Sequence, residues 1–484
     1  FNITSPPSYE SFTYPTNRLI GGISYLSPNN YYSYAFNITS PSYIYFNVWS
    51  TSPVTVYILN GQEYGMLTFN GFINDYLYSE SGMNITGYYY VNETGMYFVV
   101  IYNTGMEPAY VIHFAYPENN TIGGDWDFPI GIADYGIAII NDSLFAYSYR
   151  TDEFIGVVTI NNAYTQEPST CPSGSVEPGN NWFDVQLNAM LIVNITGGQT
   201  QYYWVQNTLF MGSTNHEYYI NDNIWNESSI SLVLNKDLVV GNGTTSKSKL
   251  GYWYGYATPT LQASLPFTVY LIIKTGLSSS GYPWVAFGYS LNNQSITWYD
   301  NVTIKVPAEA AYMEVAPATN PYGTRIDAEL VITGPGNSMC TVVKSMNADL
   351  ALYFAWPYPS DKYLAPVPSM WDIGSDTAET VFNAYSVPIG YGEVEVLNGY
   401  EKIDFLGSSY FIPLTIISPI SGTASHIYTI GSTVTLSEPQ TVVLTPGETR
   451  YALINYVINN TLIIPSRVIN LTLNGPTSVY VNYT

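Results

Sequence analysis

The sequence predicts an all-β protein made of several antiparallel β-sandwich or jelly-roll domains in series. Short runs rich in Tyr, Val, Ile and Phe recur along the 484 residues, and Tyr alone accounts for 48 of them, a composition typical of strands. The chain also holds 38 Gly and 30 Pro, which divide it into short segments. The only convincing helix start is Asp376-Thr-Ala-Glu379, a capping-box pattern.

Residues 1–118 form the first predicted domain. They hold about eight strand-like runs, enough for one small sandwich or jelly roll. Examples are the runs at 31–39, 42–49, 54–60 and 95–103.

The runs between residue 119 and about residue 400 are longer and their loops are more varied. We divide this region into a first half, 119–307, and a second half, 308–400, which form two packed sandwiches or one large one. The last segment, 401–484, returns to short strands and resembles an immunoglobulin-like sandwich.

The charge balance excludes nucleic acid as a partner. Thirteen basic residues stand against 36 acidic ones, a net charge of −23, and no basic patch is visible. Charged residues make up only 10% of the chain. Because paired carboxylates lose their contribution to stability in acid, a chain with few of them loses little there. Acidic surfaces also suit halophilic proteins, but those use far more Asp and Glu. We therefore expect adaptation to an acidic environment.

Several features predict an extracellular protein, secreted or associated with the cell surface. No apolar run approaches the eighteen residues of a membrane span, and Phe1 is expected to be the mature terminus left by a removed signal peptide. N-linked glycans are expected partners, and cell-envelope association or homo-oligomerisation stays open. Fourteen Asn-X-Ser/Thr acceptors are spread along the chain: Asn2, Asn37, Asn84, Asn92, Asn119, Asn141, Asn194, Asn226, Asn242, Asn293, Asn301, Asn459, Asn470 and Asn482.

The chain has two cysteines, Cys171 in a loop-like stretch and Cys340 before a strand-like run. A disulfide between them would close a very long loop and restrict the unfolded chain, a contribution of roughly 4–5 kcal/mol in the entropy model. Two free thiols are the alternative.

Most familiar hydrolytic chemistries are absent from the sequence. There is no G-x-S-x-G elbow, and the three histidines, His113, His216 and His426, are far apart, which argues against a catalytic triad. No H-E-x-x-H or paired Cys/His spacing points to zinc, and no Asp-Thr-Gly or phosphate-binding loop occurs. We expect no metal and no cofactor, so carboxyl and amide groups remain as candidates.

Several motifs resemble the thermopsin family of secreted acid proteases. They include GIADYGIAI (131–139), AYSYRTDEFIGVVTI (146–160), FDVQLN (183–188), YYWVQN (202–207), RIDAELVITGPGN (325–337) and GSDTAETVFN (374–383). The resemblance covers about residues 130–400. It implies an endopeptidase that is active in acid and uses neither metal nor histidine, and it leaves the first and last domains as accessory or anchoring modules.

Asp327 and Glu329 are the first candidate catalytic pair. They are two residues apart in a predicted strand, so both side chains leave the same face, while Ala328 and Leu330 point to the core. Their Cα atoms would then lie roughly 6–7 Å apart, close enough for the carboxyls to share a water molecule. The plainer alternative is a solvated strand face.

Further carboxyl groups lie in the motifs that carry the family resemblance. Asp376 and Glu379 form a second candidate pair, although Asp-x-x-Glu is also ordinary helix capping. Asp134 and Asp300 are weaker candidates, for which a turn-forming role is expected.

Gln206, in YYWVQN, is a candidate for stabilising an oxyanion. Glutamic peptidases, which are also acid-active β-sandwiches, use a glutamate to activate water and a glutamine to bind the oxyanion. By analogy of chemistry, Gln206 pairs with Glu329 or Glu379; a Gln that satisfies backbone groups is the alternative. Trp204, Trp284 and Trp298 are expected to line the substrate groove, unless they are core residues.

The sequence thus predicts a secreted acid endopeptidase whose substrate is polypeptide, bound by strand addition at a sheet edge. The main alternative is a non-enzymatic glycosylated protein of the cell surface, in a filament or an adhesive role. A carbohydrate-binding module is a third option, since exposed Tyr and Trp stack on sugars.

Overall fold

The structure is a computed structural model of the chain. The residues that it describes are 20–70, 73, 75–117, 129–140, 143–166, 181–229, 231–248, 251–292, 294–359, 363–399, 405–408, 411–420, 422–429, 432–437, 439, 441–445, 449–459, 462–473 and 475–484. These residues form forty strands and one helix, and most sheets are antiparallel, which confirms the predicted all-β class. The jelly-roll and immunoglobulin-like topologies stay predictions.

The N-terminal sheet has the strand order β1-β6-β3-β5-β2, with β4 paired to β3, and all its pairs are antiparallel. Alternate residues of β3, such as Ile44, Phe46 and Val48, are buried in its core, as the period of two predicts. Its strands are β1 (Ile20–Leu26), β2 (Tyr31–Ile38), β3 (Ser42–Asn60), β4 (Tyr78–Val91), β5 (Gly95–Tyr102) and β6 (Ala109–Pro117).

The one described helix, α1 (Gly61–Asn70), follows β3 and was not expected from the sequence. Asn60 caps it: its Oδ1 accepts the N–H groups of Gln62 and Glu63, at 2.9 and 3.0 Å, and the Glu63 carboxylate accepts the Asn60 N–H at 2.8 Å. These bonds form a capping box with Asn in place of Ser or Thr. Ten residues are too few for α1 to cross a membrane.

The prediction of a helix that begins at Asp376 is wrong, because residues 376–379 are not helical. Residues 376–379 lie in the connection between β28 (Ser369–Ile373) and β29 (Thr380–Phe382). Glu379 does not close a capping box there, because its carboxylate accepts the backbone N–H of Ser338 at 2.8 Å and the hydroxyl of Thr377.

Two large sheets make up the middle of the chain. The first has fourteen strands, with the central order β15-β18-β14-β13-β12-β25-β7-β28-β32, and the second has ten, with the order β16-β22-β21-β20-β11-β26-β31-β30. Strands from both sides of residue 307 pair within each sheet, so the two predicted halves share one core.

The remaining strands of the fourteen-stranded sheet are β7 (Ile130–Asp134), β10 (Tyr149–Thr151), β12 (Trp182–Ile195), β13 (Gln199–Gly212), β14 (Glu217–Asn226), β15 (Leu232–Val233), β17 (Thr244–Lys247), β18 (Gly251–Ala257), β19 (Leu261–Gln262), β23 (Ala308–Thr319), β24 (Arg325–Ile326), β25 (Ala328–Thr333) and β32 (Phe405–Ser408). Those of the ten-stranded sheet are β11 (Glu153–Gln166), β16 (Val239–Val240), β20 (Phe267–Leu277), β21 (Pro283–Leu291), β22 (Thr297–Ile304), β26 (Cys340–Trp356), β27 (Tyr363–Pro366), β30 (Ala384–Gly390) and β31 (Glu393–Asn398). β8 (Ile137–Ile140) and β9 (Ser143–Ala146) form a separate pair.

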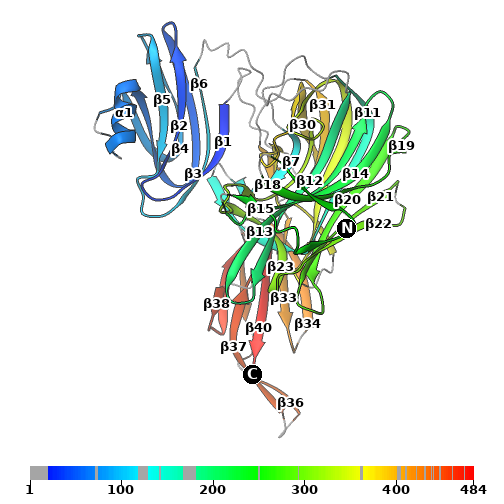
Figure 1. Cartoon of the computed structure of the whole chain (residues 1–484). Coiled ribbons are helices and arrows are strands. Elements are labelled where there is room, and N and C mark those ends of the chain that lie inside the picture. The colour runs from blue at the N-terminus through cyan, green and yellow to red at the C-terminus, as the bar shows by residue number, and fades with distance from the viewer. Residues whose placement is uncertain are drawn as a thin grey trace.

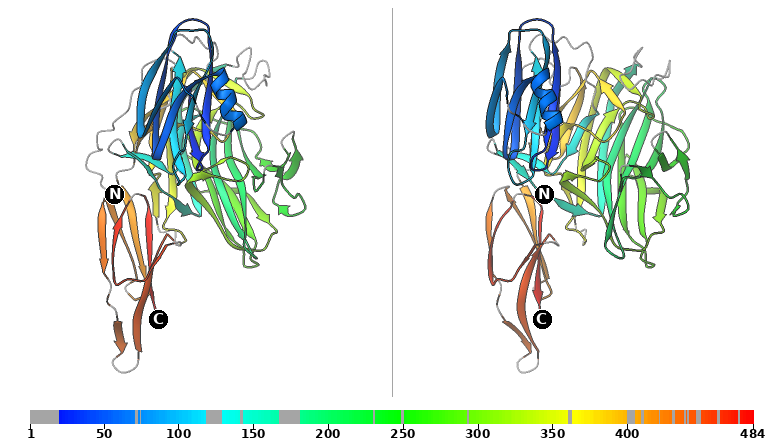
Figure 2. Two further views of the ribbon diagram at one scale, coloured as in Figure 1. Left: turned by 90° about the vertical axis from the view of Figure 1, so that its left-hand side faces the viewer. Right: turned by 60° about the vertical axis from the view of Figure 1, so that its left-hand side comes forward.

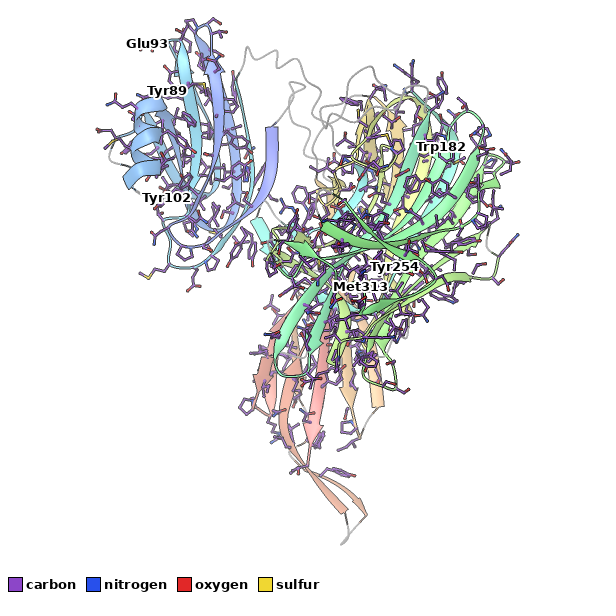
Figure 3. All side chains as sticks on the ribbon, in the orientation of Figure 1. Tyr89, Glu93, Tyr102, Trp182, Tyr254 and Met313 are labelled. Atoms are coloured by element: carbon purple, nitrogen blue, oxygen red, sulfur yellow. The ribbon has the colours of Figure 1, made fainter. Side chains whose placement is uncertain are left out.

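The main hydrophobic core lies between the two large sheets. Odd-numbered residues of β12, such as Val185, Leu187 and Ala189, point into it and meet residues of the second sheet such as Leu271 and Val285. Side chains fill this space, with Tyr254 and Met313 among them (Figure 3). The even-numbered residues of β12 therefore face outward, and yet most of them are also buried.

The C-terminal strands form a six-stranded sheet with the order β34-β33-β40-β37-β36, plus β38 on β37, and a two-stranded sheet of β35 and β39. Leu414, Leu436, Tyr456, Ile469 and Val479 join the two sheets in one small core. The strands are β33 (Phe411–Ser418), β34 (Gly422–Thr429), β35 (Thr433–Ser437), β36 (Thr441–Thr445), β37 (Thr449–Ile458), β38 (Leu462–Ile464), β39 (Val468–Thr472) and β40 (Thr477–Tyr483).

The N-terminal sheet lies beside the middle region, and the C-terminal strands extend from its lower end (Figure 1). The same arrangement is seen from two further directions in Figure 2. Trp49 and Ile112 of the N-terminal sheet belong to the same hydrophobic cluster as Ile137 and Tyr147, so the first sheet packs against the middle region through apolar side chains.

Candidate active site

Asp327 and Glu329 leave the same, outward face of the fourteen-stranded sheet. Ala328 and Leu330 belong to the core between the sheets, so the alternation of the strand turns the two acids away from it. Asp327 lies immediately before β25 and Glu329 lies within it. Both side chains are almost completely buried, with exposed fractions of 1% and 0%.

Asp376 joins these two acids from the connection between β28 and β29. Side-chain atoms of Asp327, Glu329 and Asp376 lie within 4.8 Å of one another. Within the described residues this is the one group of three or more His, Cys, Asp and Glu side chains that meets so closely. We call it the acid cluster. It unites residues from two of the motifs that carried the sequence resemblance.

Two hydrogen-bond donors hold Glu329 in place. The backbone N–H of Ser375 donates to Oε1 at 2.6 Å, and the Nδ2 of Asn188 donates to Oε2 at 3.3 Å. Gly374 passes so close that an added Cβ would lie 2.8 Å from Oε2. A side chain at position 374 would therefore press on the carboxylate of Glu329.

Burial raises the pKa of all three carboxyl groups. The pKa of Asp376 is raised to about 8, first by burial and then by the charge of Glu329. The pKa of Asp327 is raised well above its usual range by burial and by the charges of Asp376 and Glu329. Burial also raises the pKa of Glu329, but the donors Ser375 and Asn188 oppose this by stabilising its charged form. Glu329 is therefore the member that ionises most readily.

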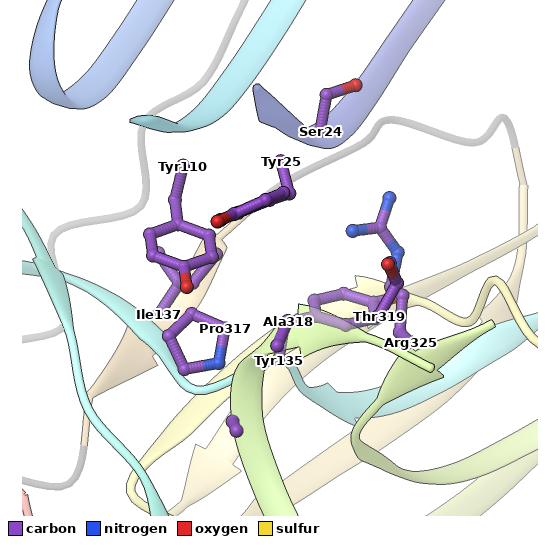
Figure 4. A pocket seen from close by; sticks show the side chains of 10 residues that line it. Ser24, Tyr25, Tyr110, Tyr135, Ile137, Pro317, Ala318, Thr319 and Arg325 are labelled. Atoms are coloured by element: carbon purple, nitrogen blue, oxygen red, sulfur yellow. The ribbon is translucent and has the colours of Figure 1, made fainter. Parts of the chain in front are cut away.

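Arg325 and Tyr135 border the acid cluster. The Nε of Arg325 donates to the Ser375 hydroxyl at 3.0 Å, and its guanidinium lies 5.1 Å from the centre of the Tyr135 ring. The Tyr135 hydroxyl donates to the carbonyl of Ile373 at 2.6 Å. Both residues also line a crevice against the N-terminal sheet, with Ser24, Tyr25 and Tyr110 on the other wall (Figure 4).

The structure places the other predicted acids apart from the cluster. Asp134 points to the core side of its strand, where Tyr147, Tyr149 and Ser369 donate to it, and burial raises its pKa to about 6. Glu379 holds the backbone of Ser338.

Asp300 lies between the two large sheets, opposite Asp222 of β14. Tyr254 donates its hydroxyl to Asp300 at 2.7 Å, and the N–H of Asn242 donates at 2.9 Å. Burial and the neighbouring Asp300 raise the pKa of Asp222 to about 9. This buried pair of carboxyl groups was not foreseen from the sequence.

Gln206 lies on the same face as the acids but does not touch them. Asn188 stands between them: it pairs in register with Glu329 on β25 and with Gln206 on β13. The Nε2 of Gln206 donates to Asn188 Oδ1 at 3.0 Å and to Gln186 Oε1 at 2.9 Å.

The three predicted groove tryptophans are divided between the sheets. Trp204 lies two residues from Gln206 on the acid-bearing face, in a cluster with Met190 and Ile326. Trp284 and Trp298 lie on β21 and β22 of the other sheet.

Cys340 is disulfide-bonded. Its predicted partner Cys171 lies outside the described residues, as do the glycan acceptors Asn2, Asn119, Asn141 and Asn293.

Sequence reasoning missed three residues around the acids: Asn188, Ser375 and Arg325. Ser375 directly precedes Asp376, and Arg325 lies two residues before Asp327, both within the quoted motifs, which was a usable signal. Asn188 could be found only from the strand register, since 141 residues separate it from Glu329.

The acid cluster has the groups needed to hydrolyse an amide. A carboxylate can take a proton from water while a neighbouring carboxylic acid gives a proton to the carbonyl. Three ionised carboxylates this close could also bind a divalent cation, but their raised pKa values keep protons on them in acid and so disfavour metal binding there.

Comparison with known proteins gives two findings. The thermopsin family model matches residues 109–384, more than half of the chain and including every member of the acid cluster. The chain is also 29% identical to thermopsin from Sulfolobus acidocaldarius over 299 residues, which cover 59% of this chain and 84% of that protein. This chain belongs to the thermopsin family, a family of peptidases.

Proposed function

We propose that the protein is an extracellular endopeptidase that hydrolyses polypeptide in acid with the carboxyl groups of Asp327, Glu329 and Asp376. One observation carries the proposal: three acids meet within 4.8 Å on one face of a sheet, with a backbone N–H aimed at one of them. Membership of the thermopsin family supports the peptidase activity. The assignment of these residues rests on the geometry.

In this proposal Glu329 is the general base. It carries the negative charge because Ser375 and Asn188 donate to it. Glu329 takes a proton from a water molecule, and the water oxygen attacks the carbonyl carbon of the peptide bond. Asp376, which is partly exposed, gives its proton to the carbonyl oxygen.

Collapse of the tetrahedral intermediate completes the reaction. The C–N bond breaks as the proton on Glu329 passes to the leaving nitrogen and Asp376 recovers its proton from the oxygen. The products are a carboxylic acid and an amine. Asp327 retains its proton, and the charge of Glu329 keeps Asp376 from ionising, because two adjacent carboxylates repel each other.

An extracellular, glycosylated protein fits this role. Exposed Asn-X-Ser/Thr acceptors among the described residues are Asn37, Asn84, Asn92, Asn242, Asn301, Asn470 and Asn482, and Asn194, Asn226 and Asn459 are partly exposed. We propose that glycans occupy some of these positions. Digestion with a glycosidase followed by mass spectrometry of the peptides would identify them.

Peptide release from an unfolded protein tests the proposed activity. We expect the wild-type protein to release peptides from acid-denatured globin at acidic pH values where Glu329 is ionised and Asp376 is still protonated, and Asp327→Asn to lose at least a hundredfold in rate. Asp237→Asn, an exposed acid far from the cluster in sequence, is the matched control. No release by well-folded wild-type protein at any pH contradicts the proposal and favours a non-enzymatic surface protein.

A further inference from the structure

A row of amide side chains leads away from the acid cluster across the sheet. In register on successive strands lie Glu329 of β25, Asn188 of β12, Gln206 of β13 and Asn223 of β14. Their side chains are linked in order: Asn188 donates to Glu329, Gln206 to Asn188, and Asn223 to Gln206 at 3.4 Å. We call Asn188, Gln206 and Asn223 the amide row.

A second row runs beside it, two residues along each strand. Met190 pairs with Trp204, Trp204 with Trp225, and Trp225 with Trp253 of β18. The rings of Trp225 and Trp253 stack with centres 5.9 Å apart. We call Trp204, Trp225 and Trp253 the tryptophan row. Met190 of β12 lies between Trp204 and the acid-bearing strand, as Asn188 lies between Gln206 and Glu329.

Polar atoms along these rows lack partners within the described part of the chain. The indole nitrogen of Trp204 on one side, and the Thr208 hydroxyl and the Asn221 carbonyl oxygen on the other, are buried without a hydrogen bond. Buried polar groups are nearly always satisfied. Unpaired donors and acceptors therefore flank the amide row on both sides, and a ligand with alternating N–H and C=O groups could pair with them.

We propose that the two rows bind the substrate polypeptide, in extended form, on one side of the bond that is cut. The amide row pairs with its backbone, and the tryptophan row packs against alternate apolar side chains. This inference rests on the proposed function, since the acid cluster fixes where the cut occurs. It places the peptide across the sheet face rather than along a sheet edge.

The rows run from a closed end to an open one. Glu329 and Asn188 are fully buried, while Asn223, Trp225 and Trp253 are partly exposed. In this proposal the chain enters over β14 and β18, at the partly exposed end, and runs toward the acids at β25. The three strand steps from Glu329 to Asn223 span about 14 Å, the length of about four extended residues.

This length sets a specific expectation for substrate size. Peptides of known cleavage site, lengthened one residue at a time on each side, should gain in kcat/KM up to about four residues on one side and then level off. Each amide contact contributes about three- to tenfold, the usual net value of a hydrogen bond. When the peptide is lengthened on the other side of the cleaved bond, kcat/KM should stop rising after fewer residues.

Two substitutions test the amide row. Asn223→Leu, at the partly exposed end, and Gln206→Leu, in the middle, should each raise the KM of the longest peptide by three- to tenfold and lower kcat by less than threefold. In both variants, lengthening the peptide should raise kcat/KM by less than it does in the wild-type protein. Asn161→Leu, an exposed amide on the other sheet, is the control. If Gln206→Leu does not fold, Asn223→Leu alone decides.

Binding to an inactive protein separates this inference from the proposed function. A fluorescent ten-residue peptide with apolar residues at alternate positions should bind Glu329→Gln, and Asn223→Leu added to it should weaken that binding at least threefold. Cleavage with normal length dependence in both row variants would overturn the inference and leave the peptidase intact. If Asn223→Leu weakens peptide binding but the wild-type protein cleaves no peptide, the proposed peptidase function is overturned and the proposed binding site is not.

Discussion

The backbone N–H of Ser375 donates a hydrogen bond of 2.6 Å to the carboxylate of Glu329, 46 residues earlier in the chain. This bond draws the connection after β28 onto the face of β25 and sets Asp376 beside Asp327. It also stabilises the charge on Glu329 while burial keeps protons on the other two acids. This contact thus helps to assemble the acid cluster, and in the proposed mechanism it also distinguishes Glu329 from the other two acids.

Gly374→Ala should disturb this contact. An added Cβ would lie 2.8 Å from the Oε2 of Glu329, so either the carboxylate or the connection must move. We expect peptide release to fall by at least tenfold, since misplacement by about 1 Å costs about a hundredfold in well-positioned sites. Gly65→Ala in α1, where nothing lies within 4 Å of the new Cβ, should leave the rate unchanged. Equal rates in both variants would argue against the assigned position of Glu329.

The rate should depend on pH as a bell. The proposed mechanism needs Glu329 ionised and Asp376 protonated, so the rate should fall as pH drops below the pKa of Glu329, which is raised above 4.5, and as pH rises past about 8. A profile of kcat/KM against pH checks this. Asp376→Asn should remove the alkaline limb and leave a low, flat rate there. An unchanged alkaline limb in that variant would assign it to another group.

The fold should be more stable in acid than at neutral pH. Asp134, Asp376 and Asp222 have folded pKa values of about 6, 8 and 9, above their unfolded values near 4. The native state therefore binds more protons than the unfolded chain between these values. The stability they contribute is complete below about pH 4 and is lost as pH rises through the folded pKa values.

Urea unfolding at several pH values measures this effect. Since each unit of pKa difference is worth about 1.4 kcal/mol, we expect a loss of several kcal/mol between pH 4 and pH 8. Asp222→Asn, which cannot ionise, should flatten the dependence, whereas the exposed Asp237→Asn should not. A free energy of unfolding that increases toward pH 8 would contradict the buried, protonated carboxyls.

Asn60→Ala should destabilise the N-terminal sheet through α1. The change removes the acceptor for two N–H groups at the start of the helix, which typically costs about 1 kcal/mol. Thermal unfolding followed by the circular dichroism of the variant checks this. Peptide release should be unaffected, because α1 packs on Leu59 and Val100, away from the acids.

Local rules in the sequence predicted part of this site. The alternation of a strand places Asp327 and Glu329 on one face, and it can be recognised from RIDAEL alone. The family resemblance added Asp376. Neither the strand alternation nor the family resemblance predicted that Asp376 approaches Asp327. That contact depends on β28 and β25 both lying beside β7, and such long-range pairing leaves no local pattern in the sequence.

The errors have physical causes. Asp376-Thr-Ala-Glu379 has the residues of a capping box, but a tertiary contact to Ser338 takes the carboxylate of Glu379. In α1 the signal was present as Asn60 and Glu63, but Gly61 and Gly65 are poor helix formers and obscured it. The distance of Gln206 from the acids followed from a register that places Asn188 between them.

The rate of Glu329→Gln at the optimal pH of the wild-type protein tests the central claim most directly. The amide keeps the shape of the side chain but cannot take a proton from water. We expect peptide release to fall by at least a thousandfold, with an unchanged circular dichroism spectrum and with full activity in Glu309→Gln, an exposed acid outside the cluster. A folded Glu329→Gln protein that keeps more than a tenth of the wild-type rate would show that the chemistry lies elsewhere.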